Sequence, residues 1–84
     1  MRVKKLLDKL KDILSAERHA QLEKYASLKK VLKALRVEKT RLKKDLAESS
    51  DENERRELAT RLKVISAQRK KGLTVLKELQ KERK

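Results

Sequence analysis

Apolar side chains recur in alternating steps of three and four residues along two long stretches of the chain. This spacing is that of a coiled-coil seam, in which such residues face a partner helix. The first seam contains Tyr25, Leu28, Leu32, Leu35, Leu42 and Leu46, with Lys39 in one core position, and the second contains Leu58, Leu62, Ile65, Leu76 and Leu79, with Arg69 and Gly72 in two core positions.

The two seams are mirror images about residue 52, so that Leu32, for example, is opposed by Gly72. An antiparallel helix pair has this symmetry, because each core layer meets its partner after the chain reverses. The pattern therefore predicts a helical hairpin with helices from Ala16 to Glu48 and from Ser50 to Glu82. A single unbroken helix that pairs antiparallel with a second copy has the same mirror relation. It stays an alternative, because no Gly or Pro marks a turn.

An acidic stretch from Ala47 to Leu58 contains the mirror centre, which makes it the expected hairpin tip, near residues 48–52. Ser49, Ser50 and Asp51 are all suitable N-cap residues, and Ser49 and Glu52 have the spacing of a capping box. Acids in the first turn of the second helix are also favoured by the helix macrodipole. The predicted acidic tip consists of Asp45, Glu48, Asp51, Glu52 and Glu54.

A third apolar stripe lies at the N-terminus and predicts a short amphipathic helix from Val3 to Leu14 within residues 1–15. A polar run separates it from the first seam, which indicates a break between helices. Burying each large side chain is worth about 1.5–3 kcal/mol, so the stripe folds back as a third helix, dimerises or docks on another protein. We expect a protein contact, and its predicted residues are Val3, Leu6, Leu7, Leu10, Ile13 and Leu14.

The expected fold is therefore all-α: an antiparallel coiled-coil hairpin over residues 16–84, preceded by an amphipathic helix over residues 1–15. Composition supports this, because 46% of the residues are charged and the chain has no Pro, Trp or Phe and a single Gly. Such a composition is typical of long helices. The uncovered N-terminal stripe and the polar core positions Lys39 and Arg69 favour a homo-oligomer, most simply a dimer.

Charge is unevenly distributed along a chain whose net charge is +13. Residues 24–44 carry nine Lys or Arg and one Glu, and residues 58–77 carry six Lys or Arg and no acid. A hairpin places both stretches side by side in a rod about 45 Å long. Basic surfaces of this kind attract phosphate backbones. The candidate basic surface consists of Lys29, Lys30, Lys33, Arg36, Lys43, Lys44, Arg61, Lys63, Lys70 and Lys71.

No pattern in the chain indicates catalysis or a cofactor. His19 is the one histidine, and there is no Cys. A thin rod also lacks a concave pocket. We therefore expect no enzyme activity, no cofactor and no metal. No apolar run reaches the roughly 18 residues of a membrane span. Asp8 and Asp12 interrupt the lysines of the N-terminal helix, which disfavours membrane association, and a cytoplasmic location is the default expectation.

Two hypotheses for function follow. In the first, the protein is a small coiled-coil adaptor or assembly factor that docks on a protein partner through its apolar helix faces and basic stems. In the second, it is a nucleic-acid or ribonucleoprotein-binding accessory protein that uses the basic stems. The chain offers no aromatic platform for stacking bases, so such binding would lack sequence specificity.

Overall fold

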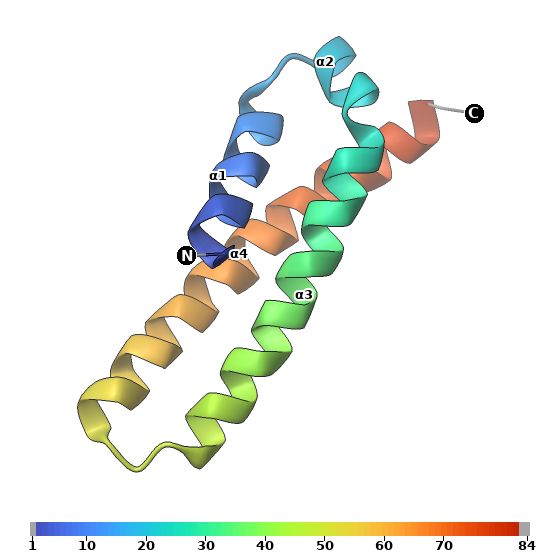
Figure 1. Cartoon of the computed structure of the whole chain (residues 1–84). Coiled ribbons are helices and arrows are strands. Elements are labelled where there is room, and N and C mark those ends of the chain that lie inside the picture. Colours follow the sequence, from blue (N-terminus) through green and yellow to red (C-terminus); the bar gives the residue numbers. More distant parts are fainter. Residues whose placement is uncertain (1, 83–84) are drawn as a thin grey trace.

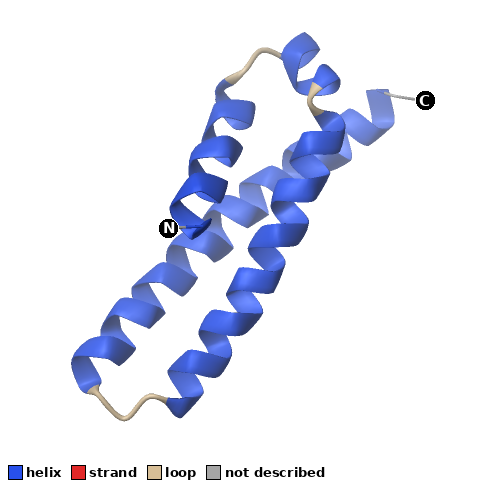
Figure 2. Cartoon of the chain, in the orientation of Figure 1, coloured by secondary structure: helices blue, strands red, loops and turns tan. Residues whose placement is uncertain are grey.

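The two heptad seams form the two longest helices of the protein, and these pair as a hairpin (Figure 1). The computed structural model describes residues 2–82. Its helices are α1 (Arg2–Ser15), α2 (Arg18–Glu23), α3 (Tyr25–Glu48) and α4 (Glu52–Glu82). No strand occurs within these residues (Figure 2). The predicted all-α hairpin is confirmed. The alternative of one unbroken helix across the mirror centre is wrong, because the chain reverses between Glu48 and Glu52.

The core of the hairpin is the seam between α3 and α4. Heptad spacing keeps one side of each helix facing the other over many turns. The molecule is accordingly a rod with extents of 48 × 19 × 16 Å. The buried seam residues are Leu28, Leu32, Leu35 and Leu42 from α3 and Leu58, Ile65, Gly72 and Leu79 from α4. Lys39 and Arg69, the two charged seam positions, are half-buried.

The N-terminal stripe packs on the hairpin as a third helix. Figure 1 shows α1 beside the half of the hairpin that lies away from the tip, and α1 contacts both α3 and α4. Leu10 and Ile13 are buried within the same core as the seam residues. Of the three outcomes open for this stripe, the structure shows the fold-back. The regions 1–15 and 16–82 therefore share one hydrophobic core.

The connection between α1 and α3 differs from the predicted continuous helix that starts at Ala16. A short helix, α2, comes first, and the chain leaves helical geometry at Lys24, where φ is −96° and ψ is 15°. The backbone hydrogen bond from Leu28 N–H to the Lys24 carbonyl continues directly into α3. Sequence phase located the break in this polar run, but the helix that follows it starts at Tyr25 and not at Ala16.

Of the three N-cap candidates Ser49, Ser50 and Asp51, it is Asp51 that caps α4. Asp51 Oδ1 accepts hydrogen bonds from Asn53 N–H at 2.9 Å and Glu54 N–H at 3.4 Å, as an N-cap side chain does. The Ser49 hydroxyl is directed instead at the Asp51 carbonyl oxygen, at 3.5 Å. The expected capping box of Ser49 with Glu52 is therefore wrong, and α4 begins at Glu52.

Candidate functional site

The six apolar residues predicted to contact a protein partner all lie on the inward side of α1. Leu10 and Ile13 are buried, and the other four are half-buried and packed against the core: Val3, Leu6, Leu7 and Leu14. The expectation that this stripe is uncovered is therefore corrected. The reason is that the groove between α3 and α4 offers these side chains an apolar surface within the same chain.

All ten candidate basic residues are exposed, but α1 divides them between two sides of the hairpin. The side covered by α1 is marked by a hollow that Lys9 and Ile13 of α1 share with Ser27 and Val31 of α3. We call the opposite side of the α3–α4 pair the open face. The arrangement of α1 in Figure 1 shows why: one side of the pair carries a third helix and the other carries none.

A groove runs between α3 and α4 on the open face. Its walls are basic and its floor is apolar, since it combines long cationic side chains with leucines of the seam. The residues that line it are Lys29, Lys30, Leu32, Lys33 and Arg36 from α3 and Arg69, Leu73 and Leu76 from α4.

The cations continue along both helices beyond this groove. On α3, Lys33 and Arg36 line a second shallow hollow together with Lys44, which lies about two turns beyond Arg36 toward the tip. Lys43 follows Arg36 by seven residues, which is close to two full turns and the same side of the helix. On α4, Lys63, Lys70 and Lys77 repeat at the same interval, and Lys70 precedes the groove residue Leu73 by one turn. The open face therefore carries two basic rows.

Two of the predicted basic residues lie elsewhere. Lys71 lines a hollow with Lys11 and Leu14 of α1, on the covered side. Arg61 precedes Gln68 of that same hollow by seven residues, so helical periodicity places it on the covered side as well. Lys30 lines hollows on both sides and marks the outer edge of α3. The structure thus brings seven of the ten residues to the open face: Lys29, Lys33, Arg36, Lys43, Lys44, Lys63 and Lys70.

The charges of the open face are not neutralised by ion pairs within the part of the chain that the structure describes. Among residues 2–82, the ion pairs join Arg18 to Glu78 and Glu82, and His19 to Glu23. None of these involves a candidate basic residue. Lys29 has its ammonium 5.8 Å from the centre of the Tyr25 ring, a cation–π contact that leaves the charge in place.

Away from the tip, along residues 25–44 of α3 and residues 58–77 of α4, acids are kept off the open face. The stretch of α4 from residue 58 to 77 contains none. On α3, Glu38 follows Val31 by seven residues and so lies toward α1, where its side chain is largely buried. Asp45 follows Glu38 by the same interval and shares that side. The one-signed charge is therefore a property of a single face and not of the rod as a whole.

Arg69 belongs to this surface although its sequence position indicated only a weak core slot. Its side chain is half-buried, and Nε–H donates to the Leu32 carbonyl oxygen across the seam at 3.3 Å. The guanidinium group consequently lies in the groove beside Lys33 and Arg36. The heptad pattern located Arg69 at the seam, but only the packing shows toward which side its head group turns.

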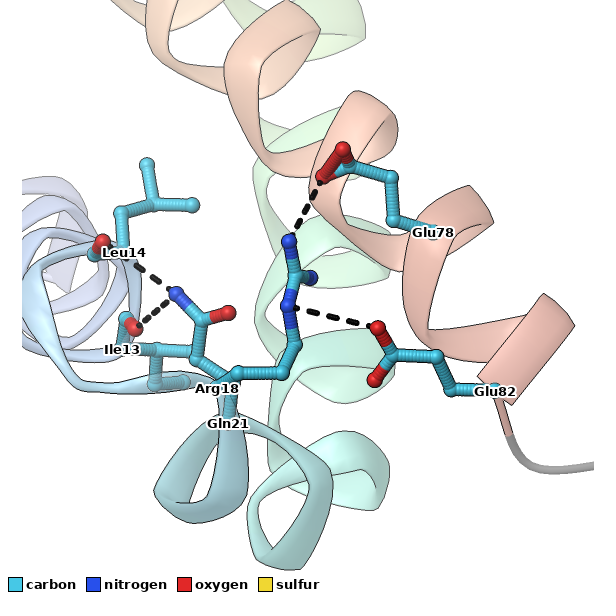
Figure 3. Close-up of polar contacts among 6 residues, drawn as sticks. All are labelled: Ile13, Leu14, Arg18, Gln21, Glu78 and Glu82. Atoms are coloured by element: carbon cyan, nitrogen blue, oxygen red, sulfur yellow. Dashed lines mark hydrogen bonds and ion pairs between the residues drawn. The ribbon is translucent and has the colours of Figure 1, made fainter.

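Sequence reasoning also missed the polar contacts that hold α2, which Figure 3 shows. Gln21 is buried, and its side-chain amide donates to the carbonyl oxygens of Ile13 at 3.1 Å and Leu14 at 3.3 Å. These carbonyls are among the last of α1, where the regular helical hydrogen bonds end; the Ile13 carbonyl also accepts from Ala16 N–H at 3.2 Å. Arg18 pairs with Glu78 at 3.2 Å and Glu82 at 3.6 Å on α4. A lone Gln in a polar run gave no signal of this role.

The acidic tip is exposed at all five predicted positions. Its one side chain with a structural contact is Asp51, the cap of α4. Arg55 reaches back from α4 and donates to the carbonyl oxygens of Leu46 at 2.7 Å and Ser49 at 3.1 Å, near the end of α3. Part of the acid therefore serves the turn. Within residues 2–82, no group of three His, Asp or Glu side chains is arranged to hold a metal ion.

No helix among the described residues is sufficiently long and apolar to span a membrane. Comparison with known proteins adds no relative, since no family model, curated protein or solved structure matches the chain. A function for the protein must therefore be inferred from the open face itself.

Proposed function

We propose that the protein binds nucleic acid through the open face, by contacts to the phosphate backbone that do not read base sequence. The supporting observation is the charge of this face: away from the tip, exposed cations from α3 and α4 lie together without an acid among them, and none of them forms an ion pair among residues 2–82. Neutralising phosphates releases condensed counterions, which makes such a surface an effective binder of nucleic acid.

The burial of the α1 stripe favours this function over the adaptor hypothesis. A protein partner would reach Leu10 and Ile13 only after α1 had left the hairpin, whereas the open face needs no rearrangement. A cytoplasmic location and a homo-oligomeric state are compatible with the proposal, and neither is required by it.

The test is binding to duplex DNA, duplex RNA and single-stranded RNA in a salt titration from about 50 to 200 mM. A footprint of about five phosphates predicts a log–log slope near −4.5 on duplex DNA and near −3.5 on a single strand. Affinity that survives at about 150 mM salt supports the proposal. Loss of all binding below that concentration contradicts it and directs attention to an acidic protein as the partner of the open face.

A matched pair of charge-reversal variants separates the open face from net charge. The test variant carries Lys33→Glu, Arg36→Glu, Lys43→Glu and Lys70→Glu. The control carries the same number of reversals on α1 and the covered side: Lys4→Glu, Lys5→Glu, Lys11→Glu and Lys71→Glu. We expect the test variant to lose binding and the control to keep most of it. Equal loss in both would show that attraction is generic and that the open face has no special role.

A further inference from the structure

Arg69 differs from the other cations of the open face in being held in place. Its Nε–H donates to the Leu32 carbonyl oxygen at 3.3 Å, and its aliphatic stem lies in the seam. The lysines at the walls of the groove have no such bond. The two terminal amino groups of Arg69 have no hydrogen-bond partner within residues 2–82. The side chain therefore presents a fixed fork of unused donors.

The fork lies one turn from a level at which α3 and α4 are closely packed. Gly72, one turn after Arg69, faces Leu32 so closely that an added Cβ would be 2.7 Å from Leu32 Cδ2. Lys29, Lys33 and Arg36 surround the same groove from α3, and Leu73 contributes to its floor. Positive charge thus converges on one point where apolar side chains exclude part of the solvent, and electrostatic attraction is stronger there than in water.

A phosphate group is the ligand that fits these features. The arginine fork matches two oxygens of a phosphate with parallel, charge-assisted hydrogen bonds, and an arginine fixed beforehand loses little entropy when it binds. The surrounding lysines add point charges without demanding a particular geometry. A single carboxylate matches the fork as well and carries the same unit charge as a phosphodiester, but a nucleic-acid strand supplies a regular series of such charges to the neighbouring cations and releases counterions when it binds.

We infer that Arg69 anchors a backbone phosphate of the bound nucleic acid at the floor of the groove, with Lys29, Lys33 and Arg36 completing the site. This inference rests on the proposed function and adds a specific binding residue to it. Single strands and duplexes both supply phosphodiesters. The lysines at the rim are accessible to either, whereas a phosphate must enter the groove to reach Arg69.

The test compares Arg69→Gln with Arg61→Gln, which removes the same charge on the covered side. The probe is mixed-sequence single-stranded RNA of about 20 nucleotides, long enough for the binding sites typical of single strands. A duplex of equal length forms the second arm. At about 100 mM salt we expect Arg69→Gln to weaken binding about ten-fold or more, the effect of losing a charge-assisted hydrogen bond. Arg61→Gln should change it by less than about two-fold.

Two further readouts separate phosphate binding from a purely structural role of Arg69. Arg69→Lys keeps the charge without the fork and should recover part of the lost affinity. The salt slope of Arg69→Gln on the single strand should fall by about 0.7, the value of one phosphate. In the wild-type protein, the 15N–1H resonance of Arg69 Nε should shift as RNA is added. This readout applies even if Arg69→Gln folds poorly.

The outcomes distinguish this inference from the proposed function. If the wild-type protein binds RNA but Arg69→Gln and Arg61→Gln behave alike, and the Nε resonance does not move, the Arg69 site is wrong while the open face stands. If the wild-type protein binds no probe, the proposed function fails first. If Arg69→Gln weakens binding ten-fold for the single strand but not for the duplex, the phosphate at Arg69 comes from a single strand that enters the groove. If binding to the single strand and to the duplex weakens equally, the phosphate belongs to a backbone that either form can place in the groove.

Discussion

Gly72 of α4 lies directly against Leu32 of α3, and Leu10 of α1 meets both. A Cβ on Gly72 would be 2.7 Å from Leu32 Cδ2 and 3.0 Å from Leu10 Cδ1, and both leucines are buried. Protein interiors are close-packed, so neither side chain has free space into which it can move. The missing side chain at position 72 is what allows three helices to meet at one level of the rod.

Gly72→Val is therefore expected to destabilise the protein. Overpacking a buried position costs about 1–3 kcal/mol. Gly72→Ala should cost less, since replacing a helical Gly by Ala returns about 1 kcal/mol of helix propensity. The free energy of unfolding, from urea titrations followed by circular dichroism, measures both. Ala67→Val, at an exposed position of the same helix, is the control for β-branching. Equal stability of Gly72→Val and Ala67→Val would contradict the close contact.

Leu10→Ala tests whether α1 is docked in solution. Leu10 is fully buried between α1 and the hairpin. Truncating such a leucine costs about 2–5 kcal/mol, through lost burial and the cavity left behind. Val37→Ala, at a side chain 61% exposed, should change stability by less than about 0.5 kcal/mol. If both variants unfold at the same urea concentration, α1 is not part of the core, and its apolar stripe is free for the protein contact that the sequence suggested.

The hairpin was predictable because heptad spacing and mirror symmetry are both visible in one dimension. The opposition of Leu32 and Gly72, and the end of α3 at Glu48, follow from that symmetry. The fold-back of α1 was one of three outcomes that the sequence left open. An amphipathic pattern indicates that the apolar face of a helix is buried, but it does not indicate whether the same chain or another chain buries it.

The candidate surface was predictable in composition and only partly in arrangement. Charge counts identified the basic stretches, but a count along the chain does not state toward which side a side chain points. Lys71 and Arg69 are two residues whose positions the charge count misjudged. Lys71 lies on the covered side with Lys11, whereas Arg69, taken for a seam residue, reaches the open groove. Both assignments depend on where α1 sits, which the sequence left open.

Asp51→Ala and Ser49→Ala distinguish the observed cap, Asp51, from the capping box that the spacing of Ser49 and Glu52 suggested. Asp51 accepts two backbone hydrogen bonds at the start of α4, so its removal should cost about 1 kcal/mol. The Ser49 hydroxyl makes one contact at 3.5 Å, the limit of a hydrogen bond, and its loss should be nearly neutral. Urea unfolding of the two variants measures the difference. A larger effect at Ser49 would restore the capping box and contradict the observed tip.

Gln21→Glu should loosen the junction that connects α1 to the hairpin. The substitution keeps the shape of the side chain but replaces the amide that donates to the carbonyls of Ile13 and Leu14 with a carboxylate. Two acceptors then face an acceptor at the negative end of α1, which the macrodipole also disfavours. The Ile13 carbonyl keeps its hydrogen bond from Ala16 N–H, but the Leu14 carbonyl loses the amide donor and a carboxylate is placed beside both oxygens, which should cost about 1–3 kcal/mol.

The control for this substitution is Gln80→Glu on the exposed side of α4, which adds the same charge to the chain and should stay within about 0.5 kcal/mol of wild type. Amide hydrogen exchange supplies the second readout. In Gln21→Glu, exchange should accelerate in α1 while the α3–α4 seam near the tip stays protected, because the junction holds only α1 and α2. Uniform acceleration along the whole rod would mean instead that α1, α3 and α4 unfold as one unit and that Gln21 stabilises all of it.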